Sequence, residues 1–330
     1  MKTALIYDET SPDGHRSWVE AEYESPGTVR ALLDSIAAHG GRAVPVPLRP
    51  SLVADLQREA PDLAFNIAEG REGPGRESVV PAVLELLGIP YTGSDGVTLG
   101  ISLNKALTKR LAASVGVPTP PFRLLASVDD ARACRDELDY PVLIKPNLGG
   151  SSAGIEPDSV VRKPAALAER VERMIAAFDQ PCLVEGYVPG VDVTVGLLGN
   201  GEVQVLPIGR VETAGGMYSS KAKQRHDRSI VCPCALPDGL RERLADWSLR
   251  IYDAIGARDF ARVDYMLDRR GQAHFLEINP LPGLSPFYGV FPELAAAAGY
   301  DHPGLIGAIM DLAIERTAPQ RSPTHEPMAR

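Results

Sequence analysis

Cysteine and histidine are scarce in this sequence, and neither occurs in the spacing of a metal site. Only 4 cysteines and 6 histidines are present in 330 residues, with no C-x-x-C or paired Cys/His pattern. Cys232 and Cys234 are separated by a single proline, which could be read as a metal or redox pair. Structural zinc sites need two such pairs at regular spacing, so we expect buried thiols instead.

Long apolar runs and an excess of basic residues are also missing. No stretch approaches the ~20 apolar residues of a membrane span. The first ten residues, MKTALIYDET, contain too short an apolar run and too many acids for a signal peptide. The formal net charge of −9 argues against a nucleic-acid partner, which requires a basic face. We therefore expect a cytoplasmic protein with no nucleic-acid or membrane partner, although local lysines could still hold a nucleotide.

What is present is the composition of a globular protein with several domains. The chain is 44% apolar and 23% charged, and 330 residues allow two or three cores. The order of helical and strand patterns predicts an α/β (α+β) fold. Its predicted parts are an N-terminal α/β domain over 1–100, a small central domain over 101–190, a C-terminal domain over 191–316 and a flexible tail over 317–330.

Alternating strand and helix patterns predict a parallel, Rossmann-like sheet in the first domain. Residues 3–7, 43–46 and 63–67 are short apolar runs typical of strands, and residues 28–40 between the first two have helical spacing. Strand, helix, strand in this order is typical of a parallel βαβ unit. Further helices are expected over 79–87, 103–115, 165–178 and 240–255, and further strands over 142–145 and 182–185.

The segment from Phe260 to Asn279 predicts a β-hairpin. Two apolar stretches rich in strand-forming residues flank a turn sequence, and Arg270 and Gly271 are the expected loop residues. Side chains on a strand alternate between its two faces, so opposed residues share a face. This register makes two opposed pairs on one face, Asp264 with Glu277 and Arg262 with Asn279.

The opposed carboxylates of Asp264 and Glu277 predict a metal site. At roughly 5 Å between Cβ atoms, like charges directly opposite each other are destabilising. Such a pair persists when a cation lies between the two groups or when one carboxyl is protonated. The alternative is two solvated acids on an exposed face, which the apolar flanks argue against. Carboxylate and amide oxygens suit Mg²⁺ together with substrate phosphates.

A strand that ends in Lys145 runs into the Gly/Ser loop, residues 147–154. Glycines let backbone N–H groups approach a phosphate, hydroxyls donate hydrogen bonds, and the lysine adds charge. Neither a Walker loop nor G-x-G-x-x-G is present, which excludes a P-loop enzyme and a Rossmann oxidoreductase. Glu185 ends the next apolar strand, and the chain from there to Gly190 could form an adenine pocket.

In their order and spacing these motifs resemble the D-alanine–D-alanine ligase family of the ATP-grasp superfamily. The resemblance runs from about Ala64 to Ser285. It is carried by residues 84–94, 102–106, 145–154, 185–192, 221–223, 232–233, 262–264 and 277–283. It implies an ATP-grasp fold and an ATP-dependent ligase that forms a peptide bond through an acyl phosphate. It also implies two Mg²⁺ ions (with Mn²⁺ as a substitute), amino-acid or peptide substrates, and a homodimer.

The resemblance implies a role for each matching residue. For ATP these are Lys105 and Lys145 at the phosphates, Ser151 and Ser152 in the closing loop, Glu185 and Val188 at adenine, Asp192 at ribose, and Lys223 at the γ-phosphate on a loop hinged at Gly215 and Gly216. For metal they are Asp264, Glu277 and Asn279, and for catalysis Arg262, the Gly283 N–H, Ser152 and Glu22. Lys109 and Lys221 are predicted to be solvated surface lysines.

Departures from the family pattern fall at substrate positions. Gln224 stands where the family has a tyrosine, residues 65–76 lack its histidine-glycine pair, and Tyr288 replaces a serine. Only Glu22 or Glu24 could meet the ammonium of the first substrate. Three alternatives to a D-alanine ligase therefore stay open: a ligase for another amino acid, β-amino acid or small peptide, a small-molecule kinase, and a non-catalytic nucleotide-binding module.

Overall fold

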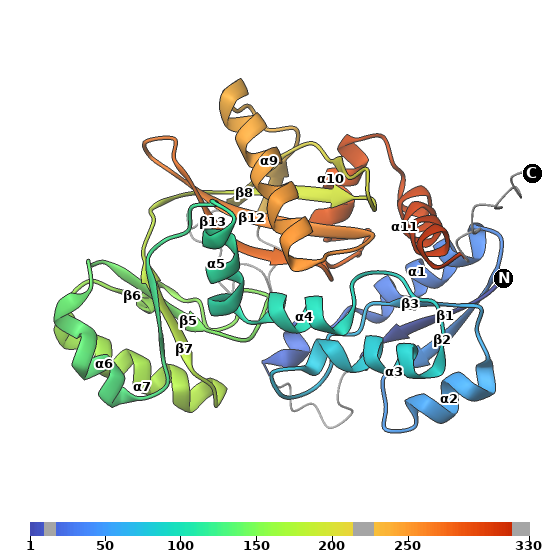
Figure 1. Ribbon diagram of the computed structural model, residues 1–330, viewed down its shortest axis with the longest axis horizontal. Helices are drawn as coiled ribbons and strands as arrows, with labels where there is room; N and C mark the ends of the chain where they lie inside the picture. Colours follow the sequence, from blue (N-terminus) through green and yellow to red (C-terminus); the bar gives the residue numbers. More distant parts are fainter. Residues whose placement is uncertain (10–17, 214–227, 319–330) are drawn as a thin grey trace, which may run out of the picture.

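The chain folds around three β-sheets, each built from a different part of the sequence (Figure 1). The computed structural model describes residues 1–9, 18–213 and 228–318. The N-terminal sheet is three-stranded, the central sheet is four-stranded, and the large sheet is six-stranded. The mixed α/β class predicted from the sequence is confirmed.

The N-terminal sheet is parallel, as predicted. β1 (Lys2–Tyr7) lies between β2 (Arg42–Pro47) and β3 (Leu63–Asn66) and pairs in parallel with both. The helices of this part are η1 (Val19–Ala21), α1 (Pro26–Ala38), α2 (Leu52–Glu59), η2 (Arg76–Ser78), α3 (Val79–Leu87) and α4 (Gly96–Leu103). α3 has the predicted bounds and ends at Gly88, which adopts φ +66°. α2 was not predicted.

The predicted helix over 103–115 is confirmed but begins two residues later, at Lys105, and the helix before it, α4, was not predicted. α4 ends at Leu103, and α5 (Lys105–Ser114) begins after Asn104, which has an extended backbone. The Asn104 side chain accepts a hydrogen bond from the Leu107 N–H at 3.1 Å and so caps α5. This cap starts a new helix direction, and it places Lys105 at the first helical position.

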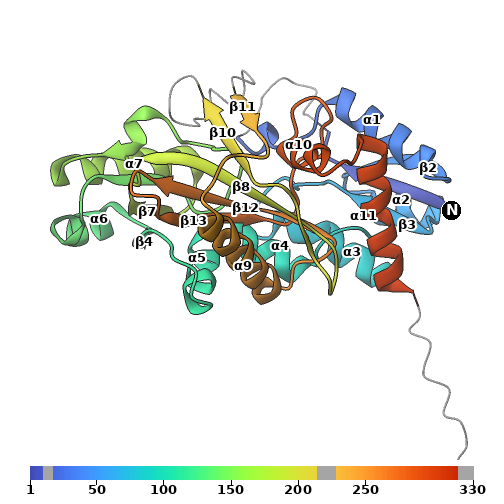
Figure 2. The same cartoon turned by 90° about the horizontal axis from the view of Figure 1, so that it is seen from above.

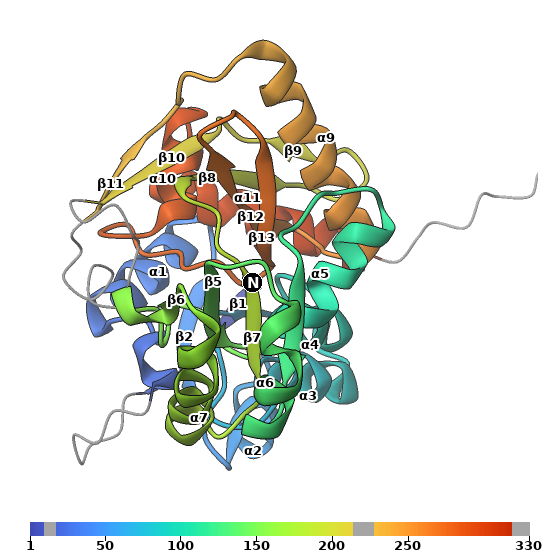
Figure 3. The same cartoon turned by 90° about the vertical axis from the view of Figure 1, so that its left-hand side faces the viewer.

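The central sheet is antiparallel and has helices on one face. Its strands, in spatial order, are β4 (Phe122–Leu125), β7 (Cys182–Gly186), β5 (Val142–Pro146) and β6 (Val160–Val161). Its helices are α6 (Val128–Cys134), η3 (Arg135–Glu137), η4 (Pro157–Ser159), η5 (Pro164–Ala166) and α7 (Leu167–Phe178). Figure 3 shows α6 and α7 side by side beneath the sheet, where they cover a core that includes Ile144 and Val184.

The large sheet is antiparallel and packs helices on two sides. Its strands are β11 (Arg228–Val231), β10 (Gly209–Thr213), β8 (Gly190–Leu198), β12 (Phe260–Asp268) and β13 (Ala273–Asn279), with β9 (Gln204–Val205) paired to β8. Its helices are α9 (Asp238–Ile255), α10 (Val290–Ala297) and α11 (His302–Thr317). One core lies under α9, and a second joins α10 and α11 to α1, which lies beside α11 in Figure 2.

β12 and β13 form the predicted hairpin, with a correction at the turn. Asp264 is opposite Glu277 and Arg262 is opposite Asn279, as predicted, but beyond Asp264 the register shifts by one residue. The expected two-residue loop is wrong. The Asp268 N–H donates a hydrogen bond to the Gln272 carbonyl at 2.8 Å, so the loop between these two residues has three residues. A β-bulge takes up the extra residue, which restores the pairing at the site.

Three of the cysteines are buried, and Cys232 is half-buried; all four are free thiols. Among the described residues, no helix combines the length and the apolar character that crossing a membrane requires.

Phe260 tests the packing of the large sheet against α10. Its side chain is 0% exposed, and its ring centre lies 5.7 Å from that of Phe291. We expect Phe260→Ala to lower the free energy of unfolding by about 3–5 kcal/mol, measured by urea denaturation, because it leaves a cavity. The control is Phe287→Ala, which removes a ring that is 69% exposed. Equal effects of the two substitutions would contradict the packing.

Candidate active site

The residues predicted from the hairpin meet on one face of the large sheet. Arg262 donates to Asp264 at 2.7 Å, and both side chains are half-buried. Asp264 also accepts a hydrogen bond from the Thr194 hydroxyl of β8 at 2.6 Å. Across the hairpin, the Lys105 ammonium contacts the Glu277 carboxylate. Each of the two opposed carboxylates therefore has its own cation.

The oxygen ligands of this face suit a hard cation. Burial would raise the pKa of Glu277, but the charges of Lys105, Lys145 and Arg262 hold that pKa well below its usual range. The carboxylate is therefore ionised at neutral pH. The Asn279 side-chain oxygen accepts from the Leu281 N–H at 2.8 Å, and a carbonyl oxygen has a second lone pair for a ligand. Asp264, Glu277 and Asn279 thus form a donor set that fits Mg²⁺.

Asp192 lies beside this donor set on β8. Burial, together with the negative charges of Asp264 and Glu277, raises its pKa to about 7. Three carboxylates therefore gather at the edge of this face. Val188 is half-buried in the connection before β8, in the segment predicted to hold adenine.

The two predicted phosphate lysines are buried at the junction of the central and large sheets. Lys105 is 8% exposed and Lys145 is 5% exposed. The Lys105 N–H donates to the Asn147 carbonyl at 3.0 Å, and the Ala106 N–H donates to the Asn147 side chain at 2.9 Å. These bonds join the start of α5 to the end of β5, and so bring the two lysines to the same region.

The prediction that Lys109 is a solvated surface lysine is wrong. Its side chain is 0% exposed and pairs with Glu185 at 2.7 Å. Lys109 lies one turn after Lys105 on the same side of α5, and this side packs against β13 rather than facing water. Lys221 and Lys223, with Gln224 and the Gly215–Gly216 hinge, lie outside the described residues.

Glu185 uses both carboxylate oxygens to hold lysines. One oxygen is 2.7 Å from the Lys109 ammonium and the other is 2.6 Å from the Lys145 ammonium. Burial alone would raise its pKa, but the two neighbouring cations lower the pKa to about 2. The side chain thus faces lysines, and it orients them.

The Gly/Ser loop lies against the N-terminal part of the chain. A Cβ atom at Gly149 would be 2.9 Å from the Trp18 ring, so only glycine fits there. The Gly150 N–H donates to Glu22 at 3.0 Å. Ser151 and Ser152 both adopt left-handed backbone angles, with φ of 55° and 56°. The predicted catalytic residue Glu22 therefore contacts the loop directly.

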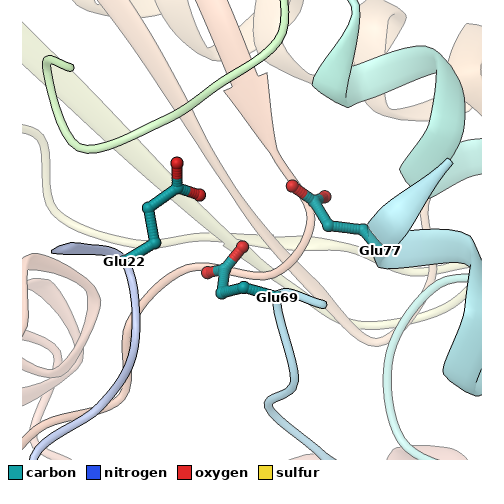
Figure 4. A group of neighbouring side chains, drawn as sticks. All are labelled: Glu22, Glu69 and Glu77. Atoms are coloured by element: carbon teal, nitrogen blue, oxygen red, sulfur yellow. The ribbon is translucent and has the colours of Figure 1, made fainter. Parts of the chain in front are cut away.

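Sequence reasoning missed an acidic cluster beside this loop. Figure 4 shows the carboxylates of Glu22, Glu69 and Glu77 pointing toward one another, and their oxygens lie within 4.8 Å. Arg76 contacts all three, at 2.7, 3.7 and 3.3 Å respectively, so the cluster already has a cation. Burial raises the pKa of Glu77 to about 8 and also raises that of Glu69. The only signal in the sequence was the altered segment 65–76.

Glu24 lies on the other side of this region, beside Gly283. Both residues, together with Glu69, line a small cavity. A Cβ at Gly283 would be 2.9 Å from a Glu24 oxygen. The Tyr288 hydroxyl donates to Glu24 at 2.8 Å and accepts from the Ser25 N–H at 3.1 Å. The altered residue Tyr288 is therefore tied to Glu24 and to the start of α1.

Comparison with known proteins agrees with the resemblance seen in the sequence. The family described as "D-ala D-ala ligase C-terminus" matches residues 111–311. The D-alanine–D-alanine ligase of Moorella thermoacetica is 32% identical over 323 residues, which cover 96% of this chain and 100% of that protein. The chain belongs to the D-alanine–D-alanine ligase family. It is an ATP-dependent ligase of this type, as predicted.

Two further relatives and a solved structure are similar to this ligase over most of its length. The D-alanine–D-alanine ligase of Desulforudis audaxviator is 34% identical, covering 87% of this chain and 92% of that protein. The uncharacterized protein y4sG of Sinorhizobium fredii is also 34% identical, covering 86% and 84%. The solved structure of the Bacillus anthracis ligase has a TM-score of 0.75 at 25% identity, covering 96% of this chain and 98% of that chain. These matches confirm the ATP-grasp fold.

The acidic cluster predicts a pH dependence of stability. Glu77 has a pKa of about 8 in the folded protein against an ordinary value of 4.5, so folding takes up a proton between these values. The free energy of unfolding then falls as pH rises through this window, by up to about 1.4 kcal/mol per pH unit. We expect Glu77→Gln to make the free energy of unfolding depend less on pH between 5 and 8, measured by urea denaturation. The exposed Glu242→Gln is the control, and an unchanged slope in Glu77→Gln would contradict this electrostatic account.

Proposed function

We propose that this ligase uses ATP to join two amino-acid or small-peptide substrates through an acyl phosphate. The observation that carries the proposal is the active face of β12 and β13. There Arg262, Asp264, Glu277 and Asn279 share one side of the hairpin, and Lys105 reaches the same side from α5. A non-catalytic nucleotide-binding module has no need of this arginine beside an ionised donor set.

ATP would bind between the central and large sheets. We propose that Lys105 and Lys145 bind the phosphates and that the loop of Ser151 and Ser152 closes over them. The segment from Glu185 to Val188 would contact adenine, and Asp192 the ribose. Lys223 would reach the γ-phosphate. This assignment is supported by the burial of Lys105 and Lys145 at the same junction.

Asp264, Glu277 and Asn279 would hold the magnesium ions. Bound Mg²⁺, or Mn²⁺ in its place, neutralises charge on the phosphates of ATP. The three protein groups supply only oxygen ligands, which Mg²⁺ prefers over softer metals.

The reaction would proceed in two steps without a covalent enzyme intermediate. The carboxylate of the first substrate attacks the γ-phosphorus of ATP, which forms the acyl phosphate and releases ADP. The amine of the second substrate then attacks the acyl carbon, and phosphate leaves. Arg262 and the Gly283 N–H would stabilise the oxyanion that forms at this carbon. Asp264 keeps the Arg262 guanidinium in place through the ion pair at 2.7 Å.

We propose that Glu22 or Glu24 binds the ammonium of the first substrate. Glu22 contacts Arg76 and the Gly/Ser loop, whereas Glu24 lies beside Gly283. Because Tyr288 and Glu69 change the groups that face this region, a substrate other than D-alanine is the main alternative. A kinase that stops at the acyl phosphate is a weaker alternative, since it does not need a second substrate. A homodimer stays a prediction.

The experiment that tests the function is phosphate release from ATP and Mg²⁺ with a panel of D-, L- and β-amino acids, singly and in pairs. We expect release that requires both an acid and an amine, with the amide product identified by mass spectrometry. Release with D-alanine alone would identify a D-alanine ligase, and release with another pair would identify a ligase of altered specificity. ADP formation with a single substrate and no amide product would favour the kinase.

Glu277 is the sharpest test of the donor set. We expect Glu277→Gln to lower kcat by more than about 100-fold, beyond the effect typical of residues that only surround a metal site. The substitution keeps the side-chain volume, so the melting temperature should stay close to that of the wild type. Glu242→Gln, which changes the same charge on an exposed part of α9, should keep full activity. Turnover by Glu277→Gln at the wild-type rate would refute the donor set.

A further inference from the structure

α5 carries a second buried lysine, Lys109, that the proposed mechanism does not use. Its ammonium has three acceptors, Glu185 at 2.7 Å, the Thr119 hydroxyl at 2.7 Å and the Phe275 carbonyl at 3.3 Å. Two of these contacts are hydrogen bonds and the one to Glu185 is an ion pair, so three acceptors surround the three N–H groups of the ammonium. Burying a charge is costly unless it is fully paired. Lys109 is therefore held in a single position.

Lys145, unlike Lys109, has N–H groups that no described residue accepts from. Its ammonium is 2.6 Å from the free oxygen of Glu185, which is its one partner in the part of the chain that the structure describes. Two donors of a group that is only 5% exposed are therefore left for a ligand. They lie where β5 runs into the Gly/Ser loop.

The charges of these residues explain why two lysines share one glutamate. Lys109 and Lys145 are two cations, and Glu185 is one anion, so one positive charge remains on the group. Without Lys109, Lys145 and Glu185 would form a neutral pair. Attraction between charges is stronger in a partly buried site than in water, so this remaining charge matters for binding a polyphosphate.

We propose that Lys109 is a positioning residue for ATP: it holds and neutralises Glu185, so that Lys145 can present its charge to the phosphates. This inference rests on the proposed function, because it takes ATP as the ligand of Lys145. The contact with Phe275 adds a second effect. Phe275 lies on β13, the strand of Glu277, so Lys109 also fixes the phosphate-binding lysine relative to that carboxylate.

The first test compares ATP with adenosine, which has no phosphates. We expect Lys109→Met to raise the Kd of ATP by about tenfold, measured by calorimetry, and that of adenosine by less than about twofold. The KM for ATP should rise in parallel, with little change in kcat at saturating ATP. Lys163→Met, which removes an exposed lysine of the same central domain, should change neither Kd. An equal loss for ATP and adenosine would mean that Lys109 acts through the fold or through the adenine segment rather than through the phosphates, which would overturn the proposal.

The second test places Lys109→Met in a Glu185→Gln background. The carboxylate that contacts Lys145 is then gone, so we expect the loss of ATP affinity caused by Lys109→Met to shrink to less than about twofold. An undiminished loss in this background would refute the charge-balance role. If Lys109→Met alone fails to fold, the double variant still has no unpaired buried carboxylate. Its Kd for ATP should then match that of Glu185→Gln, and a tenfold difference would refute the role equally.

The outcome for the wild type separates this inference from the proposed function. If the wild type does not bind ATP with Mg²⁺, both are wrong. If the wild type binds ATP and Lys109→Met binds it equally well, the proposed function stands and only the role of Lys109 is wrong.

Discussion

The active face depends on two carboxylates that the hairpin forces into opposition, Asp264 on β12 and Glu277 on β13. Like charges directly across a sheet repel, so this register is stable only with compensating cations. Arg262 supplies one from the same strand as Asp264, whereas Lys105 comes from α5. The hairpin and α5 therefore stabilise each other, and the same charges would be available to phosphates and Mg²⁺ in the proposed reaction.

α5 joins the sheets through polar contacts rather than through a large apolar surface alone. Asn147 links its first turn to the end of β5, and Lys105 contacts β13. Lys109, one turn later, contacts β7 through Glu185. Each of these groups is buried. Separating the sheets would leave each one without its hydrogen-bond or ion-pair partner, which costs free energy. The contacts that hold the sheets together are thus the same ones that orient the lysines.

The N-terminal part contributes an excess of negative charge to this arrangement. Arg76 is surrounded by Glu22, Glu69 and Glu77, and Glu22 also accepts a hydrogen bond from the Gly/Ser loop. The altered segment 65–76 belongs to this part, and Tyr288, which follows β13, contacts Glu24 and Ser25 of the same part. If the proposed function is right, these groups would face the substrates rather than ATP, so a ligase could change its substrate and keep its reaction.

Local patterns in the sequence were enough to predict the elements and their faces. Alternation with period two placed Asp264 opposite Glu277, and the strand–helix–strand order predicted the parallel sheet. The three-residue loop and the β-bulge were not predicted. The bulge lies between Asp264 and the turn, so the alternation of side chains at Arg262 and Asp264 is the same with either loop length.

The burial of Lys109 and the acidic cluster around Arg76 were decided only by the tertiary structure. Lys109 and Glu185 are far apart in the sequence, and so are Glu22 and Arg76. Periodicity shows which side of a helix a lysine occupies, but it does not show whether water or a strand covers that side. Which of the two covers it depends on how elements far apart in the sequence pack together. For a charged side chain, this packing decides whether the charge is solvated or becomes part of a binding site.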